Sequence, residues 1–187
     1  MYKMIPFSDD LDLTDFYARC AKKGFVNNSS RHMLVDCFKN EKEKQTWILY
    51  YNDVAVGSVA CHSFPEMGED AYRIAARSCV LTDELPRKSL FALKSMINNQ
   101  NVTAQFFMTT CIQWAGLDKK HYVTTNSLDG GSQRLVHNIV FPNLEKVGMC
   151  KNVGTINYRG AEQTVWHFFP EVFYKDLEKY GRWQENF

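Results

Sequence analysis

The sequence predicts an α/β fold in which helices cover both faces of one twisted, mixed β-sheet. Two patterns support this prediction: several segments carry apolar residues at helical spacing, and short apolar runs bounded by turn-forming residues lie between them. The chain has 187 residues, of which 45% are hydrophobic, and this is enough for one sizeable core. Because no repeat or linker-like stretch interrupts it, we expect a single domain over residues 1–187.

Two helices are expected near the N-terminus. The first covers residues 10–24 with Asp12 or Thr14 as its cap, and its apolar stripe consists of Leu13, Phe16, Tyr17 and Cys20. Ser29 or Ser30 then caps a second helix, whose apolar face consists of Met33, Leu34, Cys37 and Phe38.

The clearest strand signal follows the second helix. Residues 47–51 and 54–64 are largely apolar and flank Asn52 and Asp53, two residues that tolerate positive φ. This pattern predicts a tight hairpin with a two-residue turn. Residues 72–81 are rich in small and apolar side chains, which predicts a third strand in a central position.

Helices and strands alternate through the second half of the chain. A helix is expected to begin at Pro86, because a first-turn residue needs no backbone N–H partner, and to continue to Ile97. The elements after it are expected in this order: a helix over 102–115, a strand over 121–125, a turn at Gly130-Gly131, a helix over 132–140, strands over 155–158 and 163–169 around Arg159-Gly160, and a helix over 170–180. The residues of these helices expected to face the core are Phe107, Cys111, Trp114, Leu135, Val136 and Ile139.

This order of elements, over roughly residues 8–170, resembles the Gcn5-related N-acetyltransferase (GNAT) superfamily. Residues 52–57 resemble that family's turn into its third strand, and residues 111–115 with the strand at 121–125 resemble its central helix and fifth strand. The resemblance implies a GNAT-like twisted mixed sheet of about six or seven strands. It also implies acetyl-CoA or another acyl-CoA as donor, and a small-molecule or macromolecular amine as acceptor.

The sequence departs from that family at the phosphate-binding loop. The family's Gln/Arg-x-x-Gly-x-Gly/Ala motif lets backbone N–H groups approach the pyrophosphate at a helix start, and this chain has no such motif. The expected substitutes are the side chains of Arg87, Lys88 and Ser89 or, alternatively, the segment 100–104. Backbone groups at Val80, Leu81 and Thr82 are expected to hold the pantetheine of the donor.

Two other functions stay open. Residues 82–89 and Asp129 are similar to features of the phage Mom proteins, which share the fold and modify adenine in DNA. That resemblance implies a nucleobase-modifying enzyme, and only this alternative calls for a nucleic-acid partner. A non-catalytic binding domain that has lost the phosphate loop is the third possibility.

Five side chains are candidates for the chemistry. Asp83 and Glu84 follow a central strand, where a carboxylate can take a proton from an attacking amine, although they can equally cap the next helix. His62 is a candidate base or a buried structural histidine. Asp129 either contacts the acceptor or forms a turn. Tyr158 either protonates the leaving thiolate, as a family tyrosine does, or packs in the sheet.

The patterns of charged residues, cysteines, histidines and apolar residues limit the expected partners, metal sites and cellular location. The 22 basic and 21 acidic residues nearly cancel, which argues against a chain-wide electrostatic grip on nucleic acid or membrane. The six cysteines include no Cys-x-x-Cys pair, so we expect reduced thiols and a cytoplasmic location. His62, His121 and His137 lack ligand spacing, and no metal site is expected. No run approaches 18 apolar residues, so no membrane span is expected, and the oligomeric state is left open.

Overall fold

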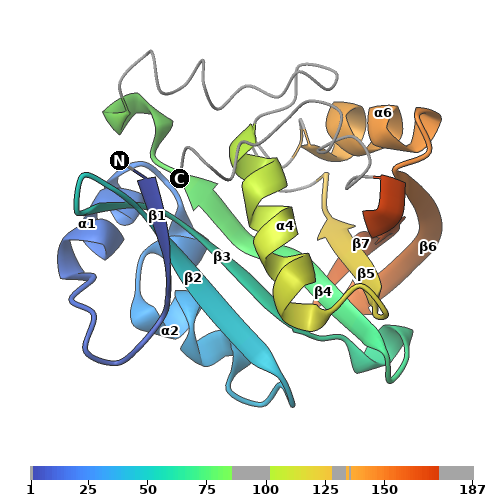
Figure 1. Cartoon of the computed structure of the whole chain (residues 1–187), viewed down its shortest axis with the longest axis horizontal. Helices are drawn as coiled ribbons and strands as arrows, with labels where there is room; N and C mark the ends of the chain where they lie inside the picture. The colour runs from blue at the N-terminus through green and yellow to red at the C-terminus, as the bar shows by residue number, and fades with distance from the viewer. Residues whose placement is uncertain (1, 86–101, 128–133, 135, 173–187) are drawn as a thin grey trace.

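The computed structural model describes residues 2–85, 102–127, 134 and 136–172, and these residues form one mixed sheet with helices on both faces (Figure 1). The seven strands of this described part lie in the order β1-β2-β3-β4-β5-β7-β6. Their bounds are β1 Tyr2–Pro6, β2 Lys44–Tyr51, β3 Val54–Ser63, β4 Ala71–Val80, β5 Lys120–Thr125, β6 Cys150–Tyr158 and β7 Ala161–Phe168. The predicted fold class is therefore confirmed.

The helices are short except for one. The α-helices are α1 Thr14–Lys22, α2 Arg31–Leu34, α4 Val102–Ala115 and α6 Phe141–Lys146. Single turns of 3-10 helix lie between them at η1 Val26–Asn28, η2 Asp36–Phe38, η3 Pro65–Met67 and η4 Thr82–Glu84, and η5 Val136–Val140 is a π-helical turn. No helix within these described residues is long and apolar enough to cross a bilayer.

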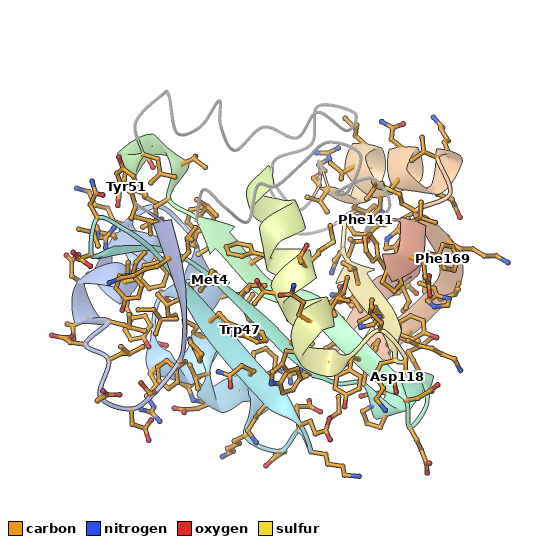
Figure 2. All side chains as sticks on the ribbon, in the orientation of Figure 1. Met4, Trp47, Tyr51, Asp118, Phe141 and Phe169 are labelled. Carbon is orange, nitrogen blue, oxygen red and sulfur yellow. The ribbon has the colours of Figure 1, made fainter. Side chains whose placement is uncertain are left out.

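The sheet separates two hydrophobic cores, because alternate side chains of a strand point to opposite faces. On β2, Trp47 packs into the core beneath α4, whereas Ile48 packs against α1. Figure 1 shows α4 across one face of the sheet and α1 and α2 on the other. Trp47 and Phe141, labelled in Figure 2, belong to the α4 core, and Met4 packs against it. Burial on both faces fixes the register of the central strands.

Local sequence signals predicted the two N-terminal helices and the hairpin that follows them, although α1 begins at Thr14 and the second predicted helix is divided into α2 and η2. The Asp12 carboxylate accepts the Thr14 N–H at 3.0 Å at the start of α1, and the Ser30 hydroxyl accepts the Met33 N–H at 3.2 Å at the start of α2. Asn52 and Asp53 have φ of 47° and 65°, the left-handed values that a two-residue hairpin turn requires. The predicted hairpin is confirmed as β2 and β3.

The structure differs from the sequence prediction at three places: the edge strand β1, the start of β6 and the helix predicted over 132–140. β1 was not predicted because it is a five-residue edge strand ending in a proline. β6 begins at Cys150 rather than at residue 155, because its outward residues give no apolar alternation. Ile139, expected to face the core, is 52% exposed, and the helical path continues to Lys146.

Three expectations fall on residues outside the described part. These are the helix from Pro86, the turn at Gly130-Gly131 and all but the first three residues of the terminal helix.

The most consequential feature of the fold is the parting of β4 from β5. These parallel strands pair only at Ala71, Tyr72 and Arg73 of β4. Beyond that point their ends diverge, and the first turn of α4 lies near the opening (Figure 1). We call the region between residues 74–80 of β4 and residues 123–125 of β5 the wedge.

Two irregularities in β4 accompany the parting. Along β3 the paired positions advance by two residues, from Ser58 to Ala60 to His62, while the partners on β4 advance by three, from Cys79 to Ala76 to Arg73. Each extra residue is a β-bulge, which bends a strand and increases its twist. Ala75 and Arg77, next to these sites, have φ of 54° and 53°. β4 thus stays paired with β3 while it turns away from β5.

Candidate active site

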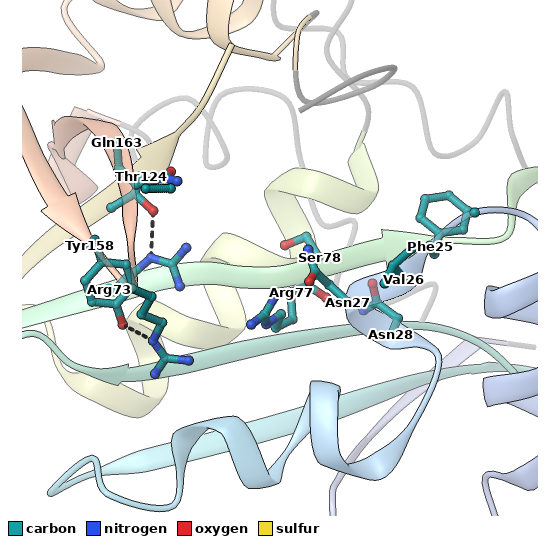
Figure 3. Close-up of a pocket in the computed structure, with 13 residues that line it drawn as sticks. Phe25, Val26, Asn27, Asn28, Arg73, Arg77, Ser78, Thr124, Tyr158 and Gln163 are labelled. Carbon is teal, nitrogen blue, oxygen red and sulfur yellow. Dashed lines mark hydrogen bonds between the residues drawn. The ribbon is translucent and has the colours of Figure 1, made fainter. Parts of the chain in front are cut away.

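A pocket of about 580 Å³ lies on the α1–α2 face, at the point where β4 and β5 part (Figure 3). Arg73, the last residue of β4 that pairs with β5, and Thr124, on the diverging end of β5, both line it. Its other described lining residues are Gly24, Phe25, Val26, Asn27, Asn28, Arg77, Ser78, Tyr158, Arg159, Ala161 and Gln163. We refer to it as the β4–β5 pocket.

Arg73 bridges the two strands immediately beyond their last backbone pair. Its Nε donates a hydrogen bond to the Thr124 Oγ1 at 2.7 Å, and its guanidinium lies over the Tyr158 ring, 5.1 Å from the centroid. Burial lowers the pKa of Arg73 to about 10, so the group keeps its charge at neutral pH. No carboxylate among the described residues forms an ion pair with it.

Arg77 lies farther along β4, on the same pocket wall. The backbone carbonyl of Arg77 accepts a hydrogen bond from the Asn28 side-chain amide at 2.7 Å, so η1 holds the bulged segment in place. The Nε of Arg77 is buried and has no hydrogen-bond partner in the described part of the chain. Buried polar groups are nearly always paired in proteins, so this atom marks a place where a partner is missing.

His62 lies below the pocket, fully buried against Phe38, with ring centroids 4.7 Å apart. Its Nδ1 lies 2.7 Å from the Ser63 carbonyl, which can only accept, so Nδ1 carries the proton and Nε2 is free to accept. Burial, together with the charge of Arg73, lowers the pKa of His62 to about 3. His62 is therefore neutral, and its 3.8 Å approach to Glu41 is not an ion pair.

Tyr158 stands between His62 and the pocket. Its hydroxyl lies 3.5 Å from the His62 Nε2 and accepts a hydrogen bond from the Arg159 Nε at 3.0 Å. Arg159 in turn donates to Glu41 at 3.0 Å. Burial raises the pKa of Tyr158, and the charge of Arg73 opposes that rise, so the phenol keeps its proton at neutral pH.

Asp83 and Glu84 lie against α1. Lys23 donates to both carboxylates, at 2.8 and 2.5 Å, and Arg19 forms a second ion pair with Glu84. The hydrogen bond from Lys23 lowers the pKa of Asp83, which makes this carboxylate a weaker base. Neither side chain is among the described residues that line the β4–β5 pocket.

The end of β4 presents alternate peptide groups to the two sides of the strand. The Leu81 N–H donates to the Val56 carbonyl at 2.8 Å and therefore faces β3. Because successive residues alternate, the N–H and carbonyl of Val80 face the wedge. The Thr82 carbonyl accepts the Leu85 N–H at 3.3 Å within the η4 turn. Of the three predicted strand-end residues, Val80 thus has backbone groups directed to the wedge.

The remaining predicted site residues lie outside the described part of the chain. They are Arg87, Lys88, Ser89 and Asp129, and with them the second half of the segment 82–89 that is similar to the Mom proteins. Those roles stay predictions.

Sequence reasoning missed the arginines of β4. The side chains expected to carry the chemistry are carboxylates, a histidine and a tyrosine, whereas the two arginines at residues 73 and 77 of a mostly apolar strand were the available signal. A charge placed within a central strand is expensive unless a partner or a ligand compensates for it.

A second missed group lies on the opposite, α4 side of β5. The Trp166 Nε1 donates to the Thr125 Oγ1 at 2.8 Å, and the same oxygen lies 2.8 Å from the His137 Nδ1. Thr125 and Trp166 are buried, whereas His137 is partly exposed. This chain of hydrogen bonds anchors η5 to the end of β5, beside the wedge.

Replacing Thr125 with valine is expected to lower the free energy of unfolding by about 1–3 kcal/mol, because the buried Trp166 N–H loses its acceptor. Thermal denaturation should then shift down by roughly 2–12 °C for a chain of this size. The matched control is Thr155→Val, the same chemical change at an exposed position of β6. Equal melting temperatures for the two variants would contradict the anchoring role.

The described residues contain no group of three or more histidine, cysteine or acidic side chains placed to hold a metal ion. All six cysteines are free thiols.

The architecture is similar to that of known acyltransferases. No protein-family model matches the sequence, and no curated protein is similar to it in sequence. Among solved structures, an acyl-CoA N-acyltransferase from Pseudomonas aeruginosa aligns with 90% of this chain and 99% of its own, at 10% identity and a TM-score of 0.51.

Two further structures give the same result. FeeM, an N-acyl amino acid synthase from uncultured soil microbes, covers 91% of this chain and 93% of its own, at 9% identity and a TM-score of 0.52. A probable acetyltransferase from Staphylococcus epidermidis covers 90% and 98%, at 12% identity and a TM-score of 0.53. At such low identities the likeness establishes the fold alone. The chain shares the fold of these structures, which confirms the GNAT-like fold expected from its sequence, and the similarity to the Mom proteins stays a prediction.

Proposed function

We propose that this protein transfers an acyl group from a CoA-type thioester to an amine. The observation that carries the proposal is the parting of β4 and β5 after three residue pairs, next to a polar pocket. Ligands of open α/β sheets bind in crevices at the carboxyl ends of strands. The parted strands and the charged pocket wall favour a catalytic site over a binding domain with a closed wedge.

The residues present fit a thioester donor in the wedge. The N–H and carbonyl of Val80 face this region and can bond an extended amide-containing chain such as pantetheine. The first turn of α4 lies near the opening, and the free N–H groups of a helix start favour phosphate groups. The donor phosphates are therefore expected near Val102, in the alternative segment 100–104 predicted from the sequence.

The transfer forms a C–N bond and breaks a C–S bond, and one proton passes from the amine nitrogen to the sulfur. Backbone N–H groups of β4 that face the wedge beyond the last pair with β5 are suited to stabilise the negative charge that develops on the thioester oxygen. Tyr158 is the best-placed of the described candidates for proton transfer, because it lines the pocket and keeps its phenol proton. It gives that proton to the sulfur and recovers one from the amine.

Replacing Val80 with proline is expected to weaken acetyl-CoA binding about tenfold, because it removes one hydrogen-bond donor from the wedge. The β3–β4 ladder survives, since the lost N–H faces away from β3. Val80→Ala is the control, because it truncates the same side chain and keeps the N–H. Isothermal titration calorimetry gives all three affinities.

The proposal fails if the native protein binds neither acetyl-CoA nor a longer acyl-CoA at millimolar concentration. Equal affinities of the proline and alanine variants would instead show that the donor binds elsewhere. The cytoplasmic location stays a prediction from the cysteine pattern.

A further inference from the structure

The β4–β5 pocket holds more positive charge than its described walls neutralise. Arg73 and Arg77 both line it, and neither has a carboxylate partner in the described part of the chain. The third arginine of the pocket, Arg159, is paired with Glu41. Figure 3 shows the side chains of Arg73 and Arg77 extending from one strand into the same space.

The rest of the described wall supplies no negative charge. Its polar side chains are neutral, and they are Asn27, Asn28, Ser78, Thr124, Tyr158 and Gln163. Elsewhere the chain pairs its semi-buried cations, as Arg19 and Lys23 are paired with Glu84. The unpaired arginines are thus a local exception in a protein whose charges otherwise nearly cancel.

The state of the Arg77 side chain points to an anionic ligand. Its Nε is buried yet unbonded among the described residues, and a buried donor without an acceptor destabilises the folded protein. The planar guanidinium fork matches the two oxygens of a carboxylate. A carboxylate on this wall would satisfy the orphan Nε and neutralise charge at the same time.

We infer that the amine acceptor carries a carboxylate, as free α-amino acids do, and that Arg73 and Arg77 bind it. This inference rests on the acyl transfer proposed above. The carboxylate against β4 positions the nearby amine toward the wedge, where the thioester carbon is attacked. A volume of about 580 Å³ accommodates an amino acid with a large side chain, so the pocket fits this class of acceptor.

The first experiment compares two acceptor mixtures with the native protein and acetyl-CoA or decanoyl-CoA. One mixture contains the twenty common L-amino acids and the other contains their α-amides, at equal concentrations. Mass spectrometry measures the N-acylated products, and phosphoethanolamine serves as a phosphate-bearing comparison. We expect the amino acids to be acylated at least thirtyfold faster than the amides, the factor that an unpaired buried charge produces.

The other outcomes separate a failure of the acceptor inference from a failure of the proposed acyl transfer. Equal or faster transfer to the amides, or a preference for phosphoethanolamine, overturns the inference and leaves acyl transfer standing. Donor binding without acylation of either mixture also overturns it. The absence of both donor binding and transfer removes the proposed function itself.

The second experiment tests Arg77 directly. Arg77→Met should lower kcat/KM for the best amino acid at least thirtyfold while changing transfer to its amide less than threefold. Arg77→Lys keeps the charge without the fork and should recover only part of the loss. Lys151→Met removes an exposed charge on β6 and is the matched control. Equal losses for the acid and the amide would assign Arg77 a structural role and overturn the inference.

Discussion

Lowering the pH from 7 to 4 is expected to cost the native protein about 3 kcal/mol of unfolding free energy more than it costs a His62→Gln variant. The reason is the burial of His62, which lowers its pKa to about 3 in the folded protein from 6.5 in the unfolded chain. Between these values the unfolded chain binds a proton that the folded protein does not. Stability from this group is complete above pH 6.5 and is lost as the pH falls toward 3.

Urea denaturation at half-unit intervals between pH 7 and pH 4 measures this difference. Glutamine is the control because it is close in size, can donate to the Ser63 carbonyl and does not titrate. The lowered pKa of His121, about 4, contributes to both proteins and cancels in the comparison. Parallel pH profiles for the native protein and the variant would show that His62 takes up its proton without unfolding.

Replacing Phe64 with alanine is expected to lower the free energy of unfolding by about 3–5 kcal/mol. Phe64 is fully buried, and its ring packs edge-on against Tyr158 with centroids 5.4 Å apart and against Tyr122 at 6.2 Å. The substitution leaves a cavity beside the Tyr158 ring, over which the guanidinium groups of Arg73 and Arg159 lie. For a chain of this length the melting temperature should fall by roughly 6–20 °C.

Phe64→Leu is the control, since it keeps most of the buried volume and should lose about 1.5 kcal/mol or less. Calorimetric unfolding of both variants separates the destabilisation caused by the cavity from that caused by losing the aromatic ring alone. A loss below 1 kcal/mol for the alanine variant would mean that the Tyr158 ring collapses into the space (a relaxation that lowers cavity costs). Phe64 would then contribute less to holding the Tyr158 ring in the pocket wall than its packing indicates.

The sequence predicts the central strands of the sheet better than the strands at its edges. The β2–β3 hairpin depends on two adjacent residues, Asn52 and Asp53, so a local pattern suffices to find it. β1 and β6 owe their conformation to neighbouring strands, and their exposed residues carry little apolar signal. The bulges of β4 depend on its register against β3, which the composition of a single strand does not encode.

The candidate site was only partly predictable, because long-range partners decide what each group can do. Glu84 is held by Arg19, 65 residues away in the chain, and no spacing rule reveals that pair. His62 and Tyr158 were predicted separately, and the structure brings them within 3.5 Å. Arg77 became a candidate only when its burial and its missing partner were visible.

The two irregularities of β4 also keep its side chains on their proper faces. Each extra residue stays unpaired, so the strand resumes its pairing with β3 without inverting the side chains that follow. Arg73, Ala76 and Cys79 therefore all lie on the face of their β3 partners, although each lies three positions from the next in the chain. β4 thus gains length relative to β3 while its side chains still divide between the same two cores.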